Sequence, residues 1–516
     1  MAGKKIIKSS VVVMLLIIGG KILAMVRDSL IAAKFGATYI SDIYNFSLGL
    51  VYLLTTISYG LTTTFIPLNS EHIEHSSSKK RNEFVNNIIT LSTFFTVIIT
   101  MMLIVFSKQI VYVFGHAFTA NVDIYSQSVE ITRIMLLSLV FVTLQSVVTG
   151  VLQSHKKFYE PAAMALVSNL VYIVYLVFLT SRYGIKGFAV ATVIGFFVQF
   201  AINLPRYRKL GYKYKFVMDI KNRDAHSMFK LMVPIIISTS VVQLNLFINR
   251  SFANNIYFGA VTVLDYSNKI NTLAYEVFAI GIAMIVYPTL SELAVKKDIL
   301  RYKKALVNAI NIIMIIMIPA AVAIGILRHP LVNLIFRHGA FDLTASDLTS
   351  NALLFYCPAM IAYGIRDILN KAFYSIKDAR TPMINSFVGI IINIIINFIL
   401  IKHMKVSGLA LATTISAIIT TMLMTTSLNK KLNGMNMKKI FYGLLKISFS
   451  SAVMGVCIYT VNYICMNEIS SFMWSNIISI FVSFVLGSAV YFICLHFTRI
   501  EEYEYILNAV KDKIPI

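Results

Sequence analysis

Long continuous apolar runs dominate the sequence and limit what the chain can fold into. Most are about 20 residues long, the length of an α-helix that crosses a hydrocarbon layer about 30 Å thick. Helices are expected because each span must satisfy its own backbone hydrogen bonds in lipid, whereas a membrane β-barrel shows alternating segments of about ten residues. The fourteen predicted helices lie near residues 9–33, 44–68, 85–106, 132–154, 161–181, 187–204, 229–250, 264–290, 305–327, 347–374, 382–402, 407–428, 440–462 and 474–497.

The composition agrees with an all-α multi-pass membrane protein. Of the 516 residues, 58% are hydrophobic and 13% are charged, whereas soluble domains have about 45–50% apolar and about 25% charged residues. The same hydrophobicity excludes a disordered chain.

The net charge of +23 indicates an orientation in the membrane. In a soluble protein such a charge points to nucleic acid, but membrane proteins keep Lys and Arg in cytoplasmic loops. With the N-terminus in the cytoplasm, the inside segments before the last helix hold 26 Lys and Arg, and the outside loops hold 8. An even number of helices then places both termini in the cytoplasm, and no nucleic-acid partner is expected. The richest loop, 206–223, is either a topology signal or a site for anionic head groups.

An internal repeat divides the chain. Several short motifs recur 221 positions later, and a few near the start of each half recur 223 positions later, so one two-residue gap reconciles the spacings. The matching motifs are Phe65-Ile66-Pro67 with Val286-Tyr287-Pro288, Ser70-Glu71 with Ser291-Glu292, Pro161 with Pro382, Gly187 to Thr192 with Gly408 to Thr413, Phe35-Gly36-Ala37 with Phe258-Gly259-Ala260, Arg27 with Arg250, and Asp42 with Asp265.

The repeat predicts the domain organisation. Residues 1–204 and 225–428 form two six-helix lobes, residues 205–224 form a basic cytoplasmic linker, and residues 429–516 add two helices and a cytoplasmic tail. An even number of helices in each lobe makes the repeats parallel, related by an axis along the membrane normal. Two such lobes around a cavity are typical of alternating-access transporters.

Ionisable residues inside the predicted helices are the candidate functional groups, because such charges are costly in lipid and usually face a cavity or a partner. Lys21 and Asp28 are seven positions apart and share one face of a helix, whereas the adjacent Arg27 and Asp28 need not pair. An excess of cations over carboxylates indicates an anionic substrate. The other charges in or near helices are Asp42, Arg133, Arg250, Asp265, Lys269, Glu276, Arg366, Asp367, Lys371 and Lys446.

No enzyme motif is present. The sequence has no P-loop, HExxH or GxSxG pattern, and its four cysteines lack metal-site spacing, so neither an enzyme nor a cofactor is expected. The energy source is then an ion gradient, the membrane potential or the substrate gradient, with the membrane potential or a monovalent cation as coupling candidates. A set of intramembrane polar residues indicates either interhelical hydrogen bonds or an ion site: Gln243, Asn245, Asn249, Asn385, Asn393 and Asn397.

Several motifs resemble the MviN/MurJ lipid II flippases of the multidrug/oligosaccharidyl-lipid/polysaccharide exporter superfamily, over essentially the whole chain. The most specific is the pattern that starts at Lys21 and ends at Asp42. The motifs are Lys21 to Asp28, Ala32 to Ala37, Ser41-Asp42, Phe65-Ile66-Pro67, Tyr287 to Ser291 and Asp378 to Pro382.

The resemblance implies movement of lipid-linked peptidoglycan precursor, lipid II, across the bacterial cytoplasmic membrane. It also implies a V-shaped central cavity and a groove for the polyprenyl tail between the last two helices. Membrane lipids and other cell-wall synthesis proteins are the implied partners. The family's essential cations fall on Lys21, Arg27 and Lys269, and its acidic residue falls on Asp28. Together with Arg250, these are the candidate residues for binding the pyrophosphate.

The sequence departs from the family pattern at four positions. Lys21 and Lys269 stand where the family typically has arginine, Asn268 stands where it has aspartate, and Thr55 stands where it has a further arginine. The charge survives at the first two positions, but bidentate phosphate contacts there do not. This leaves a flippase for another polyprenyl-linked oligosaccharide as an alternative. A cation-coupled drug exporter is disfavoured because it would need carboxylates in the cavity, and a non-transporting scaffold is the remaining alternative.

Overall fold

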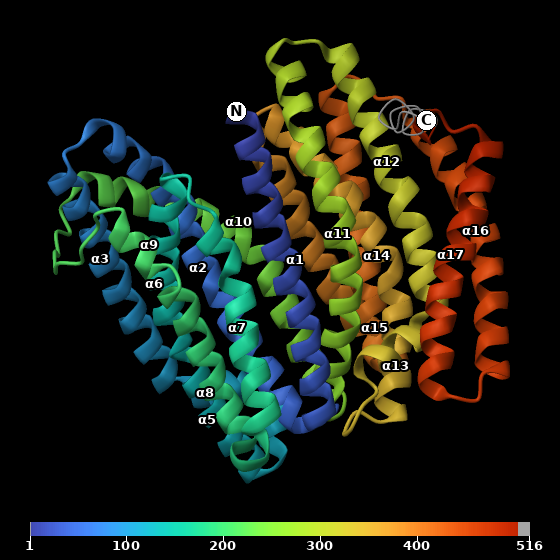
Figure 1. Ribbon diagram of the computed structural model, residues 1–516, viewed down its shortest axis with the longest axis horizontal. Coiled ribbons are helices and arrows are strands. Elements are labelled where there is room, and N and C mark those ends of the chain that lie inside the picture. Colours follow the sequence, from blue (N-terminus) through green and yellow to red (C-terminus); the bar gives the residue numbers. More distant parts are fainter. Residues whose placement is uncertain (1, 504–516) are drawn as a thin grey trace. The chain divides into compact units, whose positions relative to one another are not determined.

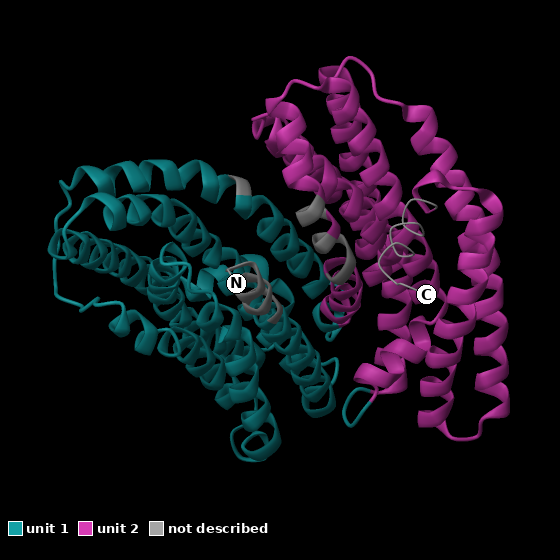
Figure 2. Cartoon of the chain, turned by 45° about the horizontal axis from the view of Figure 1, so that its top comes forward, with its two compact units in different colours: residues 1–262, 338–341 teal, residues 263–337, 342–516 magenta. Residues whose placement is uncertain are grey.

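A computed structural model describes residues 2–503, except for the side chains of 2–11, 238, 277–281 and 283–285. In this part of the chain every regular element is a helix, so the all-α prediction is confirmed. The chain forms two compact units, coloured separately in Figure 2: unit 1 holds residues 1–262 and 338–341, and unit 2 holds residues 263–337 and 342–516. The last part of the predicted cytoplasmic tail, 504–516, lies outside the described residues.

Unit 1 is a bundle in which α1 packs on α7, and α2 packs on both α6 and α10. All of its helices except α4 and η1 are labelled in Figure 1. They are α1 (Ala2–Phe35), α2 (Tyr39–His75), α3 (Ser78–Val105), α4 (Ser107–Phe114), the 3₁₀-helix η1 (His116–Ala120), α5 (Val122–Leu136), α6 (Ser138–Ser154), α7 (Tyr159–Phe178), α8 (Thr180–Ala201), α9 (Leu204–Lys209) and α10 (Arg223–Asn254).

Unit 2 is built around α12, which packs on α14 and α16, while α14 packs on α15 and α16 on α17. Its helices are α11 (Ala260–Val295, whose first turn belongs to unit 1), α12 (Ile299–Ile326), α13 (Arg328–Phe336), α14 (Leu343–Ser375), α15 (Arg380–Lys431), α16 (Met437–Glu468) and α17 (Phe472–Thr498).

Nine of the fourteen predicted segments lie within a single helix. The segments 85–106 and 305–327 extend one residue beyond α3 and α12, and the segments 132–154, 161–181 and 187–204 each run across a short break between two helices. By length and hydropathy, ten helical stretches of the described chain can cross a membrane, or eleven if the bent pair 223–237 and 239–254 counts as one span. One of the ten is α15, which has 52 residues and would be about 78 Å long if straight, more than twice the hydrocarbon thickness.

Lys405 divides α15 into two antiparallel helices. Its backbone is left-handed (φ 50°), and side-chain hydrogen bonds join the two halves in a nested order. Asn393 Nδ2 donates to Thr413 Oγ1 at 3.4 Å, and Asn385 Nδ2 donates to Ser427 Oγ at the same distance. The two predicted segments 382–402 and 407–428 therefore form a helical hairpin.

Unusual backbone conformations recur at the spacing of the sequence repeat. Gly184, which bends α8, has φ 55° and stands 221 positions before Lys405. Lys156 and Lys377, both just after a helix, have φ 57° and 60° at the same spacing. An uncommon backbone conformation is unlikely to recur at this spacing by chance. The two halves of the chain therefore share the same backbone geometry at these turns.

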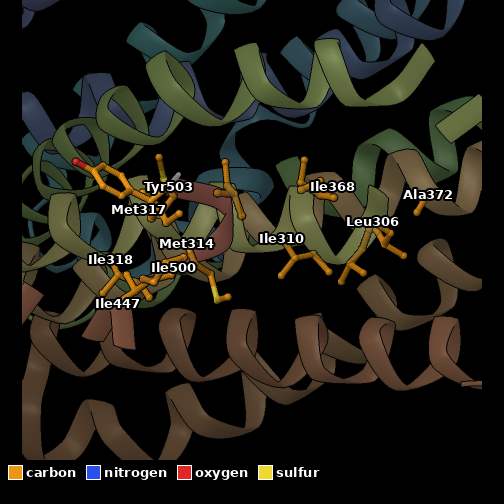
Figure 3. Close-up of a cluster of buried hydrophobic side chains, with 14 of the residues drawn as sticks. Leu306, Ile310, Met314, Met317, Ile318, Ile368, Ala372, Ile447, Ile500 and Tyr503 are labelled. Atoms are coloured by element: carbon orange, nitrogen blue, oxygen red, sulfur yellow. The ribbon is translucent and has the colours of Figure 1, made fainter. Parts of the chain in front are cut away.

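The core of unit 2 is formed around an apolar stripe of α12. Along α12, Leu306, Ile310, Met314 and Met317 recur every three or four residues and point into one cluster (Figure 3). Apolar side chains at this spacing form a continuous stripe on a helix. The stripe packs against α14 and α16, and the cluster also includes Ile500 and Tyr503 beyond the end of α17.

Candidate functional site

Arg27 in α1 is held by two neighbours in unit 1. Its Nε and Nη2 donate to Asp28 Oδ1 at 3.0 and 2.8 Å, and its Nη1 donates to Asn169 Oδ1 of α7 at 2.9 Å. The pairing with Asp28 was not required by the sequence, because adjacent helical positions point about 100° apart. It forms because the long arginine side chain curls back beside the buried carboxylate, which is 4% exposed.

Asn169 fixes the position of this guanidinium. Its amide Nδ2 donates to the carbonyl oxygens of Gly20 (3.1 Å) and Ala165 (2.8 Å), which leaves Oδ1 turned toward Arg27. The ring of Tyr172, one turn along α7, has its centre 5.7 Å from the Arg27 guanidinium carbon. Arg27 thus keeps a fixed orientation before any substrate binds.

Lys21 and Arg27 line one cavity of about 700 Å³ in unit 1. This volume lies within the range of small-molecule sites, about 300–1,000 Å³. Arg27 is paired with Asp28, so Lys21, Arg27 and Asp28 together carry a net charge of +1, which favours an anionic group. The other polar lining residues are Tyr52, Gln153, Ser168, Asn169, Tyr172 and Gln199.

A second cavity of unit 1, about 590 Å³, is lined by ten residues of α2 and α6, and six of them carry a hydroxyl group. Gln153 lines both cavities, so the two are neighbours. Thr55 lies here, at the position where the resemblance predicts an arginine. The polar residues of this wall are Thr55, Ser58, Tyr59, Thr62, Thr63, Ser146 and Gln153.

Arg250 belongs to unit 1 but lies apart from the first cavity. It packs across Gly49 of α2, where an added Cβ would lie 2.4 Å from Arg250 Nη1. A glycine at this position leaves room for the guanidinium. Among the described residues, the structure brings Lys21, Arg27 and Asp28 together, and Arg250 is not part of the same cavity lining.

Lys269 belongs to unit 2. Its Nζ lies 5.0 Å from the centre of the Tyr266 ring, which stacks on Phe336 with ring centres 4.4 Å apart. Elsewhere in this unit, the Tyr275 hydroxyl donates to Asp367 Oδ2. No group of three or more His, Cys, Asp or Glu that could hold a metal ion occurs in the described part of the chain.

Asp42 joins two turns inside unit 1. Its carboxylate accepts hydrogen bonds from Gly259 N (2.6 Å), Thr262 N (2.8 Å) and Thr262 Oγ1 (2.7 Å), at the start of α11. Asp42 is 1% exposed and Thr262 is 0% exposed. The carboxylate therefore caps a helix N-terminus from a distant part of the sequence.

Sequence reasoning missed Asn169, Tyr172 and Gln153. Each is a polar or aromatic residue inside an apolar segment, which is a signal of helix contact and of cavity lining alike. Only the packing of α7 against α1 shows that Asn169 holds Arg27.

The fold and the cationic cavity define a multi-pass helical membrane transporter. Comparison with known proteins identifies its kind. The family model for the lipid II flippase MurJ matches residues 31–480, and the chain belongs to this family.

Relatives cover most of the chain. A probable lipid II flippase MurJ of Rickettsia prowazekii (strain Madrid E) is 28% identical over 413 residues, 80% of this chain and 81% of the relative. The lipid II flippase MurJ of Burkholderia cenocepacia is 23% identical over 419 residues, covering 80% of this chain and 81% of that protein.

Solved structures share the fold. A lipid II flippase MurJ in an inward closed conformation matches with a TM-score of 0.81 at 23% identity, over 95% of this chain and 99% of that one. An inward-facing multidrug resistance MATE family transporter of the MOP superfamily matches with a TM-score of 0.67 at 15% identity, over 80% of this chain and 94% of the transporter. The predicted family is confirmed, and so is the prediction of a transport protein rather than an enzyme.

Proposed function

We propose that this protein moves lipid II from the inner to the outer leaflet of the bacterial cytoplasmic membrane. The observation that carries the proposal is the cavity of unit 1, in which Lys21 and an oriented Arg27 face the same space, in a chain of the lipid II flippase family. The conversion between inward-open and outward-open states is a rocking of two lobes.

The pyrophosphate of the substrate binds to Lys21 and Arg27. Arg27 offers a planar fork of donors and Lys21 a point charge. Asp28 and Asn169 position Arg27 and reduce the conformational entropy lost on binding. The hydroxyl-rich wall with Thr55 and Gln153 supplies donors and acceptors for a sugar or peptide. Arg250 and Lys269 are further candidate residues for binding the pyrophosphate.

The topology proposed for this function has fourteen membrane crossings, two parallel six-helix repeats, and both termini in the cytoplasm. The helical hairpin at Lys405 and the recurrence of backbone conformations at a spacing of 221 residues support it. No cofactor takes part. A potential that is negative inside favours outward movement of an anion by about 2.3 kcal/mol per charge per 100 mV, and a monovalent cation is the other coupling candidate.

Depletion of the protein in its native cell tests the function. We expect lipid II accessible on the outer face to fall and lipid II inside to accumulate. Wild-type protein restores exposure, whereas Lys21→Ala and Arg27→Ala do not, because loss of a charged hydrogen-bonding partner costs about 1.5–3 kcal/mol, or roughly 10- to 100-fold in affinity. Lys34→Ala is the matched control, since Lys34 is an exposed cation on the same helix.

Unchanged lipid II exposure in a depleted cell that has no second flippase would contradict the proposal. The alternative is then a flippase for another polyprenyl-linked oligosaccharide. Lysine rather than arginine at positions 21 and 269 favours this alternative, because a point charge selects less strictly for one phosphate geometry. Other cell-wall synthesis proteins are the proposed partners if lipid II is the substrate.

A further inference from the structure

The basic linker between α9 and α10 is fixed along the side of α3. Asn86 Nδ2 donates to the carbonyl of Lys213 at 3.0 Å. The Asn87 side chain makes two bonds to Asp219, from Nδ2 to the carbonyl (2.9 Å) and from the Asp219 amide to Oδ1 (2.7 Å). These hydrogen bonds give the linker a defined conformation against α3. A segment that served only as a topology signal would not need one. The linker lies beside α3 and α9 in Figure 1.

Tyr212 anchors the linker by packing against His155 and Arg81. It is 0% exposed, its hydroxyl lies 3.0 Å from His155 Nε2, and the Arg81 guanidinium carbon lies 4.8 Å from its ring centre. Beyond this anchor, lysines alternate with large apolar side chains. Phe216 is 74% exposed. Exposed aromatic side chains interleaved with cations are typical of segments that lie in the interface of an anionic membrane.

A cavity of about 590 Å³ lies beneath this linker, among α3, α6, α8 and α9. Its surface is mostly apolar, and Arg208 is its one charged lining residue among those described. The lining residues are Ile89, Thr90, Thr93, Phe94, Leu144, Val148, Phe200, Leu204, Tyr207, Arg208, Tyr214, Phe216 and Met218.

Two hydroxyl groups of this lining lack a partner. Tyr207 is only 4% exposed, and neither its hydroxyl nor that of Thr93 makes a hydrogen bond within the part of the chain that the structure describes. Both oxygen atoms are closed to solvent, so a bound molecule reaches them only after a shift of the lining. An apolar cavity with one arginine in its lining matches a molecule that has an apolar chain and an anionic group.

We propose that this cavity binds an anionic glycerophospholipid of the surrounding membrane. The phosphate lies on Arg208, and one acyl chain fills the apolar part of the cavity. The linker lysines supply further attraction for a negative head group. The site shares no residue with the cavity of Lys21 and Arg27, and it does not depend on the identity of the transported lipid.

Native mass spectrometry of the full-length, delipidated protein in detergent tests the site. The probes are phosphatidylglycerol and phosphatidylcholine with identical acyl chains. We expect phosphatidylglycerol to bind at least about fivefold more tightly, the effect of one cation at a membrane surface. Arg208→Gln removes this preference, whereas Lys209→Gln, a neighbouring cation outside the lining, reduces it less.

Thr93→Phe separates the cavity from surface charge. The larger side chain fills the cavity without changing any charge, so phosphatidylglycerol binding should fall at least fivefold. Leu144→Phe, from α6, makes the same test if Thr93→Phe does not elute as a single folded species in gel filtration. Equal binding of the two lipids by wild type, or full phosphatidylglycerol binding by the folded cavity-filling variants, would overturn the proposal. This experiment measures phospholipid binding and not lipid II transport. Failure of the phospholipid site would therefore be distinguishable from failure of the proposed flippase function.

Discussion

At the scale of single residues, close approaches of backbone to backbone decide which side chains are tolerated. Gly259 has φ 97°, and a Cβ added there would lie 2.2 Å from the carbonyl oxygen of Ala37. Its amide also donates to Asp42. Gly434 has nearly the same conformation (φ 93°) but faces open space. The two glycines therefore share the conformational requirement and differ in packing.

Gly259→Ala should destabilise the protein more than Gly434→Ala. Both substitutions place a side chain in a left-handed conformation, at a cost of about 1–2 kcal/mol. Only the change at Gly259 also forces two backbone segments apart, which adds about 1–3 kcal/mol. The measurement is the apparent melting temperature of each purified variant in the same detergent. Equal losses would show that the contact with Ala37 is unimportant.

At the scale of elements, the start of α15 shows how a helix end is stabilised. Asp378 Oδ1 accepts hydrogen bonds from the amides of Arg380 and Thr381, both at 3.1 Å, and Oδ2 pairs with Lys431 at the far end of the same helical hairpin. Burial raises the pKa of Asp378, but the bonds from Lys431 and Thr381 outweigh it and lower the pKa to about 2. The carboxylate of Asp378 therefore caps the first turn of α15 and links the two ends of the helical hairpin.

Asp378→Asn should therefore have a pH-dependent effect. A carboxylate whose folded-state pKa lies below its unfolded value stabilises the fold above the unfolded value, about 3.9, and loses that effect as the pH falls toward about 2. The wild type should melt at a higher temperature than Asp378→Asn at pH 7, and the difference should shrink between about pH 4 and pH 2. A difference that persists unchanged at pH 2 would rule out the charge as its cause. Glu71→Gln, which changes an exposed carboxylate on α2, is the control.

At the scale of the whole molecule, the hairpin in α15 decides how many times the chain crosses the membrane. If Lys405 marks a loop, then Arg380 and Lys430 lie on one side of the membrane and Lys402 on the other. If α15 were a single crossing, its two ends would lie on opposite sides. The basic loops predict that the hairpin ends are cytoplasmic.

Cysteine labelling tests this topology in a functional variant without the four native cysteines. Lys402→Cys should react with a membrane-impermeant maleimide in intact spheroplasts, because it lies outside. Arg380→Cys and Lys430→Cys should react only after permeabilisation. Labelling of Arg380→Cys and Lys430→Cys on opposite sides would contradict the fourteen-crossing topology.

The sequence alone determined the helices, their repeat and the class of protein. Apolar runs of about 20 residues leave the backbone no alternative to helices in lipid. Nine of the fourteen predicted segments lie within a single helix of the structure, and the other five differ from the helices only at an end residue or a short break. The motifs around Lys21 and Asp28 indicated the family that the comparisons confirm. Helices and short motifs depend on residues that are close in the sequence. They can therefore be predicted from hydrophobic runs and residue patterns alone.

Only the tertiary structure decided which side chains meet. Arg27 pairs with Asp28 and with Asn169, which is 142 positions away, and helical periodicity does not fix how α7 is rotated against α1. The role of the predicted binding residues in transport stays a prediction. The capping of α11 by Asp42, and the unpartnered hydroxyls of Thr93 and Tyr207, likewise arise from packing between distant segments, which no local pattern encodes.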